Sequence, residues 1–207
     1  MYARTTTIKG DPRAMDEGIA HVTDVVWPTV QHMSGCVGMS MLADREAGCC
    51  IVTSAWATDE AMRASAESVR ESRREAAEAL RAETVDIAEY EIAVLHRAHA
   101  AGDGACARVF WAELPSGRLD SMVDAFRMTM MSRLEELPGF CSVSMLVDRA
   151  MNRAVLSVTY ADHGAMARAA EQGRAMREEF EQGTGARVTD TAEFDLVLAH
   201  LRVPEMA

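Results

Sequence analysis

Residues 35–45, GCVGMSMLADR, return 104 residues later as residues 139–149, GFCSVSMLVDR. The same offset pairs His96 with His200, and no gap is needed to align the two halves. A period of this length indicates two fused copies of one small domain rather than a solenoid, whose repeats are about 20–50 residues long. The sequence therefore predicts two homologous domains.

The 207-residue chain divides at this offset into a first domain of residues 1–98, a linker of residues 99–104 and a second domain of residues 105–207. Each domain is large enough to bury a small hydrophobic core. Hydrophobic residues make up 49% of the chain and charged residues 26%, which is typical of globular proteins in water.

The net charge of −11 and the pI near 5.0 argue against nucleic acid or an anionic membrane as a partner, because both attract a basic face. No apolar run reaches the roughly 18 residues that cross a bilayer, and the N-terminal segment lacks the apolar stretch of a signal peptide. We therefore expect a cytoplasmic protein without a nucleic-acid or membrane partner.

Each copy shows the order strand, helix, strand, strand, helix, strand. In the first copy the periodicity predicts strands and helices over residues 4–9, 13–33, 36–43, 49–57, 59–82 and 84–96. This order predicts an α+β fold of two ferredoxin-like β-α-β-β-α-β units. Since the second face of each sheet also needs cover, we expect the two sheets to pack together as a dimeric α/β barrel within one chain.

The chain resembles the antibiotic biosynthesis monooxygenase family of dimeric α/β-barrel proteins. The resemblance rests on residues 35–38, GCVG, and residues 54–62, SAWATDEAM, with counterparts at 137–140, LPGF, and 158–166, VTYADHGAM. It implies a tandem form of that family. Members include cofactor-independent oxygenases of polycyclic aromatic quinols, haem-degrading enzymes and proteins without an assigned chemistry.

The resemblance does not extend to the haem-degrading residues of the family, which are an Asn on the first strand and a Trp and a His on the second helix. Their places are taken by Ala3, Ser65 and Glu75. The second copy has Ala107, Ala169 and Glu179 there. Because haem iron needs an imidazole or thiolate ligand, we do not expect haem degradation by that mechanism.

His96 and His200 are the candidate catalytic residues. Each stands at the end of the last strand of its copy, on the face that carries bulky apolar residues. A neutral imidazole there could take a proton from a phenol or quinol and start its reaction with oxygen. The alternative is a hydrogen-bonded or half-solvated histidine without a catalytic role.

Three large aromatic residues are candidates for binding a substrate. Trp56 and Tyr160 are equivalent, at the end of the third strand, where they could stack on a flat molecule or serve as core residues. Trp111 lies on the first strand of the second copy, where the first copy has Thr7, so a site that includes Trp111 exists in only one half.

Arg4 and Arg108 recur at the start of the first strand of each copy. They are candidates for binding an anionic group of the substrate. Alternatively, they pair with carboxylates across the strands, such as Glu89 and Glu193.

Differences between the copies suggest a further interpretation, in which one copy is active and the other is structural. His21 aligns with Ala125, and Thr7 aligns with Trp111. His21 is a substrate-binding candidate if the first copy has a site of its own, and a surface histidine otherwise.

The chain has no Gly-rich phosphate loop, no Gly-x-Ser-x-Gly motif and no Cys/His spacing of a zinc site. No metal, flavin or nucleotide cofactor is therefore implied. The five cysteines are odd in number and include no Cys-x-x-Cys pair, so we interpret them as reduced thiols.

Our leading hypothesis is a cofactor-independent monooxygenase that binds a small, flat aromatic or quinol-type molecule and lets its anion react with O2. The alternative is a non-catalytic small-molecule-binding or stress-response barrel, in which the many methionines fill the interior. Either way, the expected partner is a small apolar or aromatic ligand, and the tandem chain could also form a homodimer. The resemblance supports the fold more strongly than the function.

Overall fold

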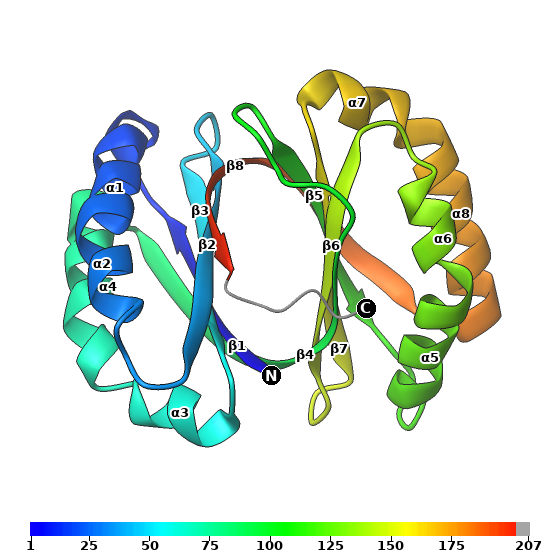
Figure 1. The fold of residues 1–207 in the computed structure, drawn as a ribbon, viewed down its shortest axis with the longest axis horizontal. Coiled ribbons are helices and arrows are strands. Elements are labelled where there is room, and N and C mark those ends of the chain that lie inside the picture. The colour runs from blue at the N-terminus through cyan, green and yellow to red at the C-terminus, as the bar shows by residue number, and fades with distance from the viewer. Residues whose placement is uncertain (202–207) are drawn as a thin grey trace. The chain divides into compact units, whose positions relative to one another are not determined.

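The computed structural model describes residues 1–201. Both copies follow the predicted β-α-β-β-α-β order, with each helical segment divided into shorter pieces (Figure 1). The elements of the first copy are β1 (Tyr2–Lys9), a 3-10 turn η1 (Pro12–Ala14), α1 (Met15–His21), a π-helical turn η2 (Val22–Val26), α2 (Trp27–Val30), β2 (Cys36–Asp44), β3 (Cys49–Trp56), α3 (Asp59–Ala64), α4 (Ser68–Ala79) and β4 (Thr84–Arg97). Those of the second copy are β5 (Cys106–Glu113), α5 (Leu119–Thr129), α6 (Met131–Glu135), β6 (Phe140–Asp148), β7 (Arg153–Tyr160), α7 (His163–Arg168), α8 (Ala170–Thr184) and β8 (Arg187–Leu201).

The predicted hairpins are confirmed as β2–β3 and β6–β7. Their turns contain Gly48 and Asn152 at equivalent positions, with φ angles of 63° and 51°. Glycine and asparagine tolerate this left-handed conformation best, so the turn residues set the point at which each chain reverses.

The first predicted helix, residues 13–33, is interrupted by η2. The Trp27 N–H bonds to the Val22 carbonyl, five residues earlier, which widens the turn. Pro28 follows directly and has no N–H to donate to Asp24. The helical segment accordingly ends at Val30.

The second predicted helix, residues 59–82, is divided into α3 and α4. The Met62 carbonyl accepts hydrogen bonds from Ser65 Oγ at 2.7 Å and Arg4 Nη2 at 2.8 Å. The Ala66 N–H bonds instead to the Arg63 carbonyl. Side chains thus satisfy the carbonyl that would have continued the helix, and the helix restarts at Ser68.

The chain forms two compact units that do not coincide with the sequence repeat. Unit 1 contains residues 1–90 and the end of β8 from Asp195, and unit 2 contains residues 91–194. The last strand of each copy therefore contributes residues to both units. The hydrogen-bonded strand order β1-β3-β2-β8-β5-β7-β6-β4 is closed, which confirms the predicted α+β fold with an eight-stranded barrel.

Each unit has its own hydrophobic core, between one face of its strands and its helices (Figure 1). In unit 1, Trp56 and Met41 are fully buried beneath α1, η2 and α4. In unit 2, Phe126 of α5 and Met166 of α7 are buried in the core between the helices and the strands. The space between strands and helices is the layer in which both units have a cavity.

Candidate functional site

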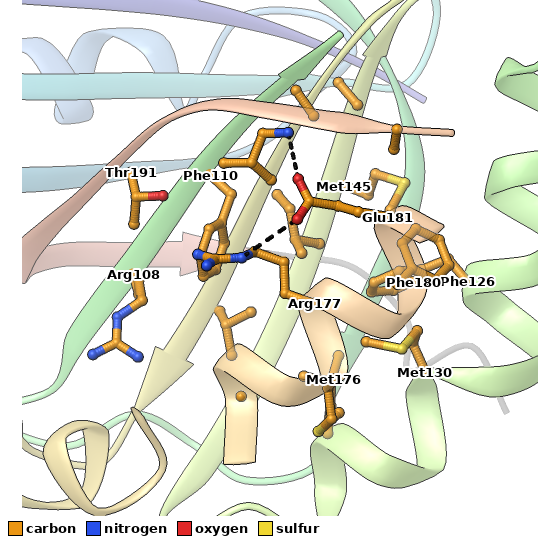
Figure 2. Close-up of a pocket in the computed structure, with 18 of the residues that line it drawn as sticks. Arg108, Phe110, Phe126, Met130, Met145, Met176, Arg177, Phe180, Glu181 and Thr191 are labelled. Atoms are coloured by element: carbon orange, nitrogen blue, oxygen red, sulfur yellow. Dashed lines mark hydrogen bonds and ion pairs between the residues drawn. The ribbon is translucent and has the colours of Figure 1, made fainter. Parts of the chain in front are cut away.

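Unit 2 contains a cavity of about 250 Å³ between its strands and helices α5, α6 and α8. An engineered cavity of about 150 Å³ is large enough to hold benzene, so this cavity can hold a larger aromatic molecule. Figure 2 shows the side chains around it. The residues that matter for its chemistry are Arg108, Phe110, Ala112, Phe126, Met130, Met145, Tyr160, Gly173, Met176, Arg177, Phe180, Glu181 and Thr191.

The cavity follows from two sequence periodicities. On β5, alternation directs Arg108, Phe110 and Ala112 to the same face of the strand. On α8, positions three and four apart share a face, which gathers Gly173, Arg177 and their neighbours opposite that strand. Because Ala112 and Gly173 have little or no side chain, the space between strand and helix stays open.

Most of the cavity wall is apolar and aromatic. The rings of Phe126 and Phe180 meet edge to face, with centroids 5.8 Å apart and an angle of 88°. Met130, Met145 and Met176 complete this part of the wall (Figure 2). Thioethers adapt to irregular shapes and pack well against aromatic rings, so the wall suits a flat apolar molecule.

Arg177 provides an unsatisfied polar atom at this wall. Its guanidinium lies 5.8 Å from the centroid of the Phe110 ring (Figure 2). The Arg177 Nε atom is buried and has no hydrogen-bond acceptor among the described residues. Glu181 Oε2 is 3.8 Å away, too far for a hydrogen bond, and Glu181 Oε1 accepts the Val188 N–H at 2.7 Å. Because buried donors are nearly always paired, this unpaired Nε–H is an exception among the described residues.

Tyr160 and Arg108 line another part of the same cavity. Tyr160 is 3% exposed, and burial raises the pKa of its hydroxyl against the opposing effect of the Arg108 guanidinium. The phenol therefore stays protonated and can donate a hydrogen bond. Arg108 is already bound to Glu193, at 2.9 Å from Nε and 2.6 Å from Nη2.

Unit 1 has a cavity at the equivalent place, but its volume is only about 50 Å³. Ile8 stands where unit 2 has Ala112, and Val69 stands where unit 2 has Gly173. These larger side chains occupy space that is open in unit 2. The two copies therefore differ in what they can bind, although their folds agree.

The two candidate catalytic histidines lie outside both cavity linings. His96, in unit 2, has Nε2 2.6 Å from Glu135 Oε1, although not in a hydrogen-bonding alignment. His200, in unit 1, stacks on Trp27 with ring centroids 5.0 Å apart. Each ring packs against the first helical segment of its unit.

Three further candidates also lie outside the cavity linings. Trp56 is fully buried and donates from Nε1 to Ser54 Oγ at 3.0 Å. Trp111 lies on the face of β5 opposite Phe110. His21 has Nε2 3.8 Å from Glu75 Oε2. Of the candidates from the sequence, the structure thus brings Tyr160 and Arg108 together at one cavity and places Arg4 at the other.

Sequence reasoning did not single out Phe110, Arg177 or Phe180. The signal that could have found them is the position-by-position comparison of the copies, because Phe110 aligns with Thr6 and Phe180 with Ala76. A large aromatic residue in one copy, aligned with a small or polar residue in the other, marks a position where the two copies differ in side-chain size and polarity.

No group of three or more His, Cys, Asp or Glu side chains within residues 1–201 is arranged to hold a metal ion. None of the helices in this range combines the length and apolar character that crossing a membrane requires.

Two uncharacterized proteins of Mycobacterium tuberculosis are similar to the chain over its full length. One is 45% identical over 206 residues, which cover 92% of that protein, and the other is 46% identical over 207 residues, which cover 87%. The chain therefore corresponds to most of each relative.

Solved structures share the fold at low sequence identity. A candidate monooxygenase of Lactobacillus acidophilus has a TM-score of 0.72 at 13% identity, with 97% of this chain and 96% of that chain covered. An anthrone oxidase-like protein has a TM-score of 0.61 at 13% identity, with 100% and 95% covered. A ferredoxin-fold protein of Listeria monocytogenes related to antibiotic biosynthesis monooxygenases has a TM-score of 0.56 at 8% identity, with 95% and 94% covered.

Residues 1–82 match the antibiotic biosynthesis monooxygenase family. The internal repeat carries the same element order through the second half, and the structural neighbours share the ferredoxin-like units. The first copy therefore belongs to the antibiotic biosynthesis monooxygenase family, and the second copy repeats its sequence pattern and element order.

Proposed function

We propose that unit 2 binds a flat, weakly acidic aromatic molecule of two or three fused rings and promotes its oxidation by O2 without a cofactor. The observation that carries this proposal is the unsatisfied Arg177 Nε–H at the wall of a mostly apolar cavity of about 250 Å³. The apolar wall would hold the rings, and the guanidinium would bind a phenolic oxygen.

Arg177 would favour the ionised form of the substrate. A positive charge beside a phenol lowers the pKa of the phenol, and a hydrogen bond to the resulting oxyanion stabilises it further. The shielded, apolar surroundings strengthen both effects. The bound anion is a better electron donor to O2 than the neutral phenol.

The reaction balances without another reductant. In a substrate such as anthrone, which has a ring CH2 group conjugated through the fused rings with the enolised carbonyl, two C–H bonds are broken and one oxygen atom of O2 forms a new C=O group. The other oxygen atom takes both hydrogens and leaves as water. The protein supplies binding, ionisation and exclusion of bulk solvent, while the substrate carbanion supplies the electrons.

A binding function without catalysis is the second candidate. Among the described residues that line the cavity there is no histidine, and the carboxylate present, Glu181, already accepts the Val188 N–H and faces Arg177. A site without a free proton acceptor fits a carrier or sensor of phenols. The proton would otherwise pass to water or to a residue outside the lining, such as the predicted His96.

The first test is calorimetric titration with 2-naphthol, using naphthalene as the matched ligand without a hydroxyl, followed by oxygen uptake with anthrone. Binding of naphthol in preference to naphthalene, together with oxygen uptake above the spontaneous rate, would support the enzyme. Preferential binding without uptake would support the carrier. Equal affinities, or no binding, would refute the proposed role of Arg177.

We place this activity in the cytoplasm. Cys49, Cys50 and Cys141 are thiols that form no disulfide bond, and Cys50 and Cys141 are buried. Unpaired cysteines are typical of reducing compartments. Fractionation of cells with an antibody to the protein would test this placement.

A further inference from the structure

The small cavity of unit 1 has a polar side that its counterpart in unit 2 lacks. Thr6 on β1, Ser54 on β3 and Ser72 on α4 all line it, next to Arg4 and Arg73. The residues of unit 2 at the three hydroxyl positions are Phe110, Val158 and Met176. These three positions are therefore polar in the first copy and apolar in the second.

Arg4 is held by four hydrogen bonds within the protein. It donates to Glu89 Oε1 from Nε and Nη2, to Ser65 Oγ at 3.0 Å and to the Met62 carbonyl at 2.8 Å. Its charge is matched by Glu89. Four of the five N–H groups of Arg4 are therefore used within the protein, and its main effect on the cavity is to add positive potential.

Arg73 has no hydrogen bond or salt bridge to any residue in the described part of the chain. The carboxylates of Glu71 and Glu78 on the same helix are bound by Arg74 instead. Arg73 is half-buried, and burial together with the charge of Arg4 lowers its pKa against the opposing effect of Glu89, which Arg4 already binds. Unit 1 therefore places one unmatched positive charge at the cavity.

In the second copy, the arginine at the equivalent position has a carboxylate beside it. Arg177, the counterpart of Arg73, has the carboxylate of Glu181 four residues further along α8, at 3.8 Å. In the first copy the position of Glu181 is taken by Ala77. The first copy has thus retained the arginine without the internal counter-ion.

We propose that unit 1 binds a small monovalent carboxylate, of the size of formate or acetate, between the Arg73 guanidinium and the hydroxyls of Thr6 and Ser72. The planar guanidinium matches a carboxylate in geometry and charge. Neither hydroxyl has a hydrogen bond to another described residue, so both are available as donors. The apolar side of the cavity, which includes Val22 and Val26, accepts the short hydrocarbon end.

Size and charge together narrow the ligand class. A volume of about 50 Å³ excludes the fused rings proposed for unit 2. One unmatched arginine balances one negative charge, so a monoanion fits better than a phosphate dianion. This site lies in a different unit and takes a different ligand from the proposed oxidation site, so a negative result at one site does not affect the other.

The test is an NMR titration of the full-length protein with sodium acetate at constant ionic strength, with chloride as the exchanged anion. The readout is the backbone amide shifts of Thr6 and Ser72. Arg73→Gln removes the proposed ligand, and Ala77→Glu supplies the internal carboxylate that the second copy has. Arg74→Gln is the matched control, since it removes the same charge one residue away on the solvent-facing side of α4.

We expect saturable shifts with a millimolar dissociation constant in the wild type and in Arg74→Gln. In Arg73→Gln the affinity should fall about tenfold or more. In Ala77→Glu it should fall by less, because Glu181 lies 3.8 Å from Arg177 in unit 2 and still leaves its Nε–H unpaired. Shifts that stay linear in the wild type, or equal affinity in all four proteins, would overturn the site. Equal binding of acetamide would exclude the role of charge, and equal binding of phosphate would exclude the assignment to a monovalent carboxylate.

Discussion

Arg4 holds Glu89 Oε1 with two hydrogen bonds, of 2.9 Å from Nε and 2.7 Å from Nη2. The second copy repeats this arrangement in Arg108 and Glu193, at 2.9 and 2.6 Å. Both pairs confirm the pairing between strands expected from the sequence. Each pair fixes the last strand of a copy to its first strand, beside the cavity.

The two pairs should differ in their contribution to stability. Arg4 is 4% exposed and has additional bonds to Ser65 and Met62, whereas the side chain of Arg108 is 14% exposed. We expect Arg4→Met to lower the free energy of unfolding by about 2 kcal/mol and Arg108→Met by about 1 kcal/mol. Urea denaturation would measure both, and a larger loss for Arg108→Met would contradict this ranking.

Arg177→Gln should weaken the binding of 2-naphthol about tenfold or more, because a hydrogen bond to a charged group contributes about 1.5–3 kcal/mol. Naphthalene, which has no oxygen to bind, should keep its affinity. Calorimetry on the same protein preparation would give both values. A parallel loss for both ligands would mean that the substitution disturbs the cavity wall rather than one polar contact.

Filling the unit 2 cavity with the residues of unit 1 should abolish ligand binding without unfolding the protein. Ala112→Ile and Gly173→Val introduce the side chains found at Ile8 and Val69, and a Cβ atom at Gly173 meets no atom within 4 Å. We expect an unchanged or higher Tm, since each added buried methylene contributes about 0.8 kcal/mol.

Both the Tm and the affinity for naphthol should be measured in this double variant. Retained naphthol affinity would show that the ligand binds elsewhere. A much lower Tm would show that the added side chains do not fit, and the single variant Gly173→Val would then provide the test of the cavity.

Cys50 should make stability depend on alkaline pH. Burial, together with the neighbouring Cys49, raises the pKa of the Cys50 thiol from 9.0 to about 12. The folded state thus holds the proton more tightly than the unfolded state. The stabilisation is complete below about pH 9 and is lost as the pH rises towards about 12.

Cys50→Ala isolates this effect, because alanine is the residue of the second copy at that position, Ala154. Above about pH 9 the free energy of unfolding should fall more steeply in the wild type than in the variant, by about 1 kcal/mol per pH unit. Urea denaturation at several pH values would show it. Parallel curves would mean that Cys50 ionises without cost in the folded state.

His96→Ala and His200→Ala test whether the histidines act in catalysis. Neither ring lines the unit 1 or the unit 2 cavity described above, so we expect the affinity for naphthol to remain unchanged in both variants. Oxygen uptake with anthrone is the deciding measurement. Loss of uptake at unchanged affinity and Tm would support a role as proton acceptor, and full uptake in both variants would remove that role.

The sequence alone carried enough information to predict the fold. Residues 35–45 and 139–149 revealed the duplication, and the turn residues Gly48 and Asn152 located the hairpins. These features are local or repeat within the chain, so they can be read without knowing which elements touch. The break between α3 and α4 was not predictable, because it depends on Arg4 reaching the Met62 carbonyl across 58 residues.

The candidate site was only partly visible in the sequence. Tyr160 and Arg108 were expected at a binding site and line the unit 2 cavity. Arg177 and Gly173 were not expected, because a half-exposed arginine and a glycine within a helix have no distinctive pattern. Their importance comes from facing β5, a strand about 60 residues earlier in the chain.

The sequence by itself determined that this protein is a duplicated β-α-β-β-α-β chain of one family, because strand alternation, helical spacing and turn chemistry are properties of neighbouring residues. Only the tertiary structure decided that the two copies enclose unequal spaces, about 250 Å³ and about 50 Å³. Cavity volume depends on pairs such as Ala112 with Gly173 and Ile8 with Val69, whose side chains meet only when strand and helix pack together.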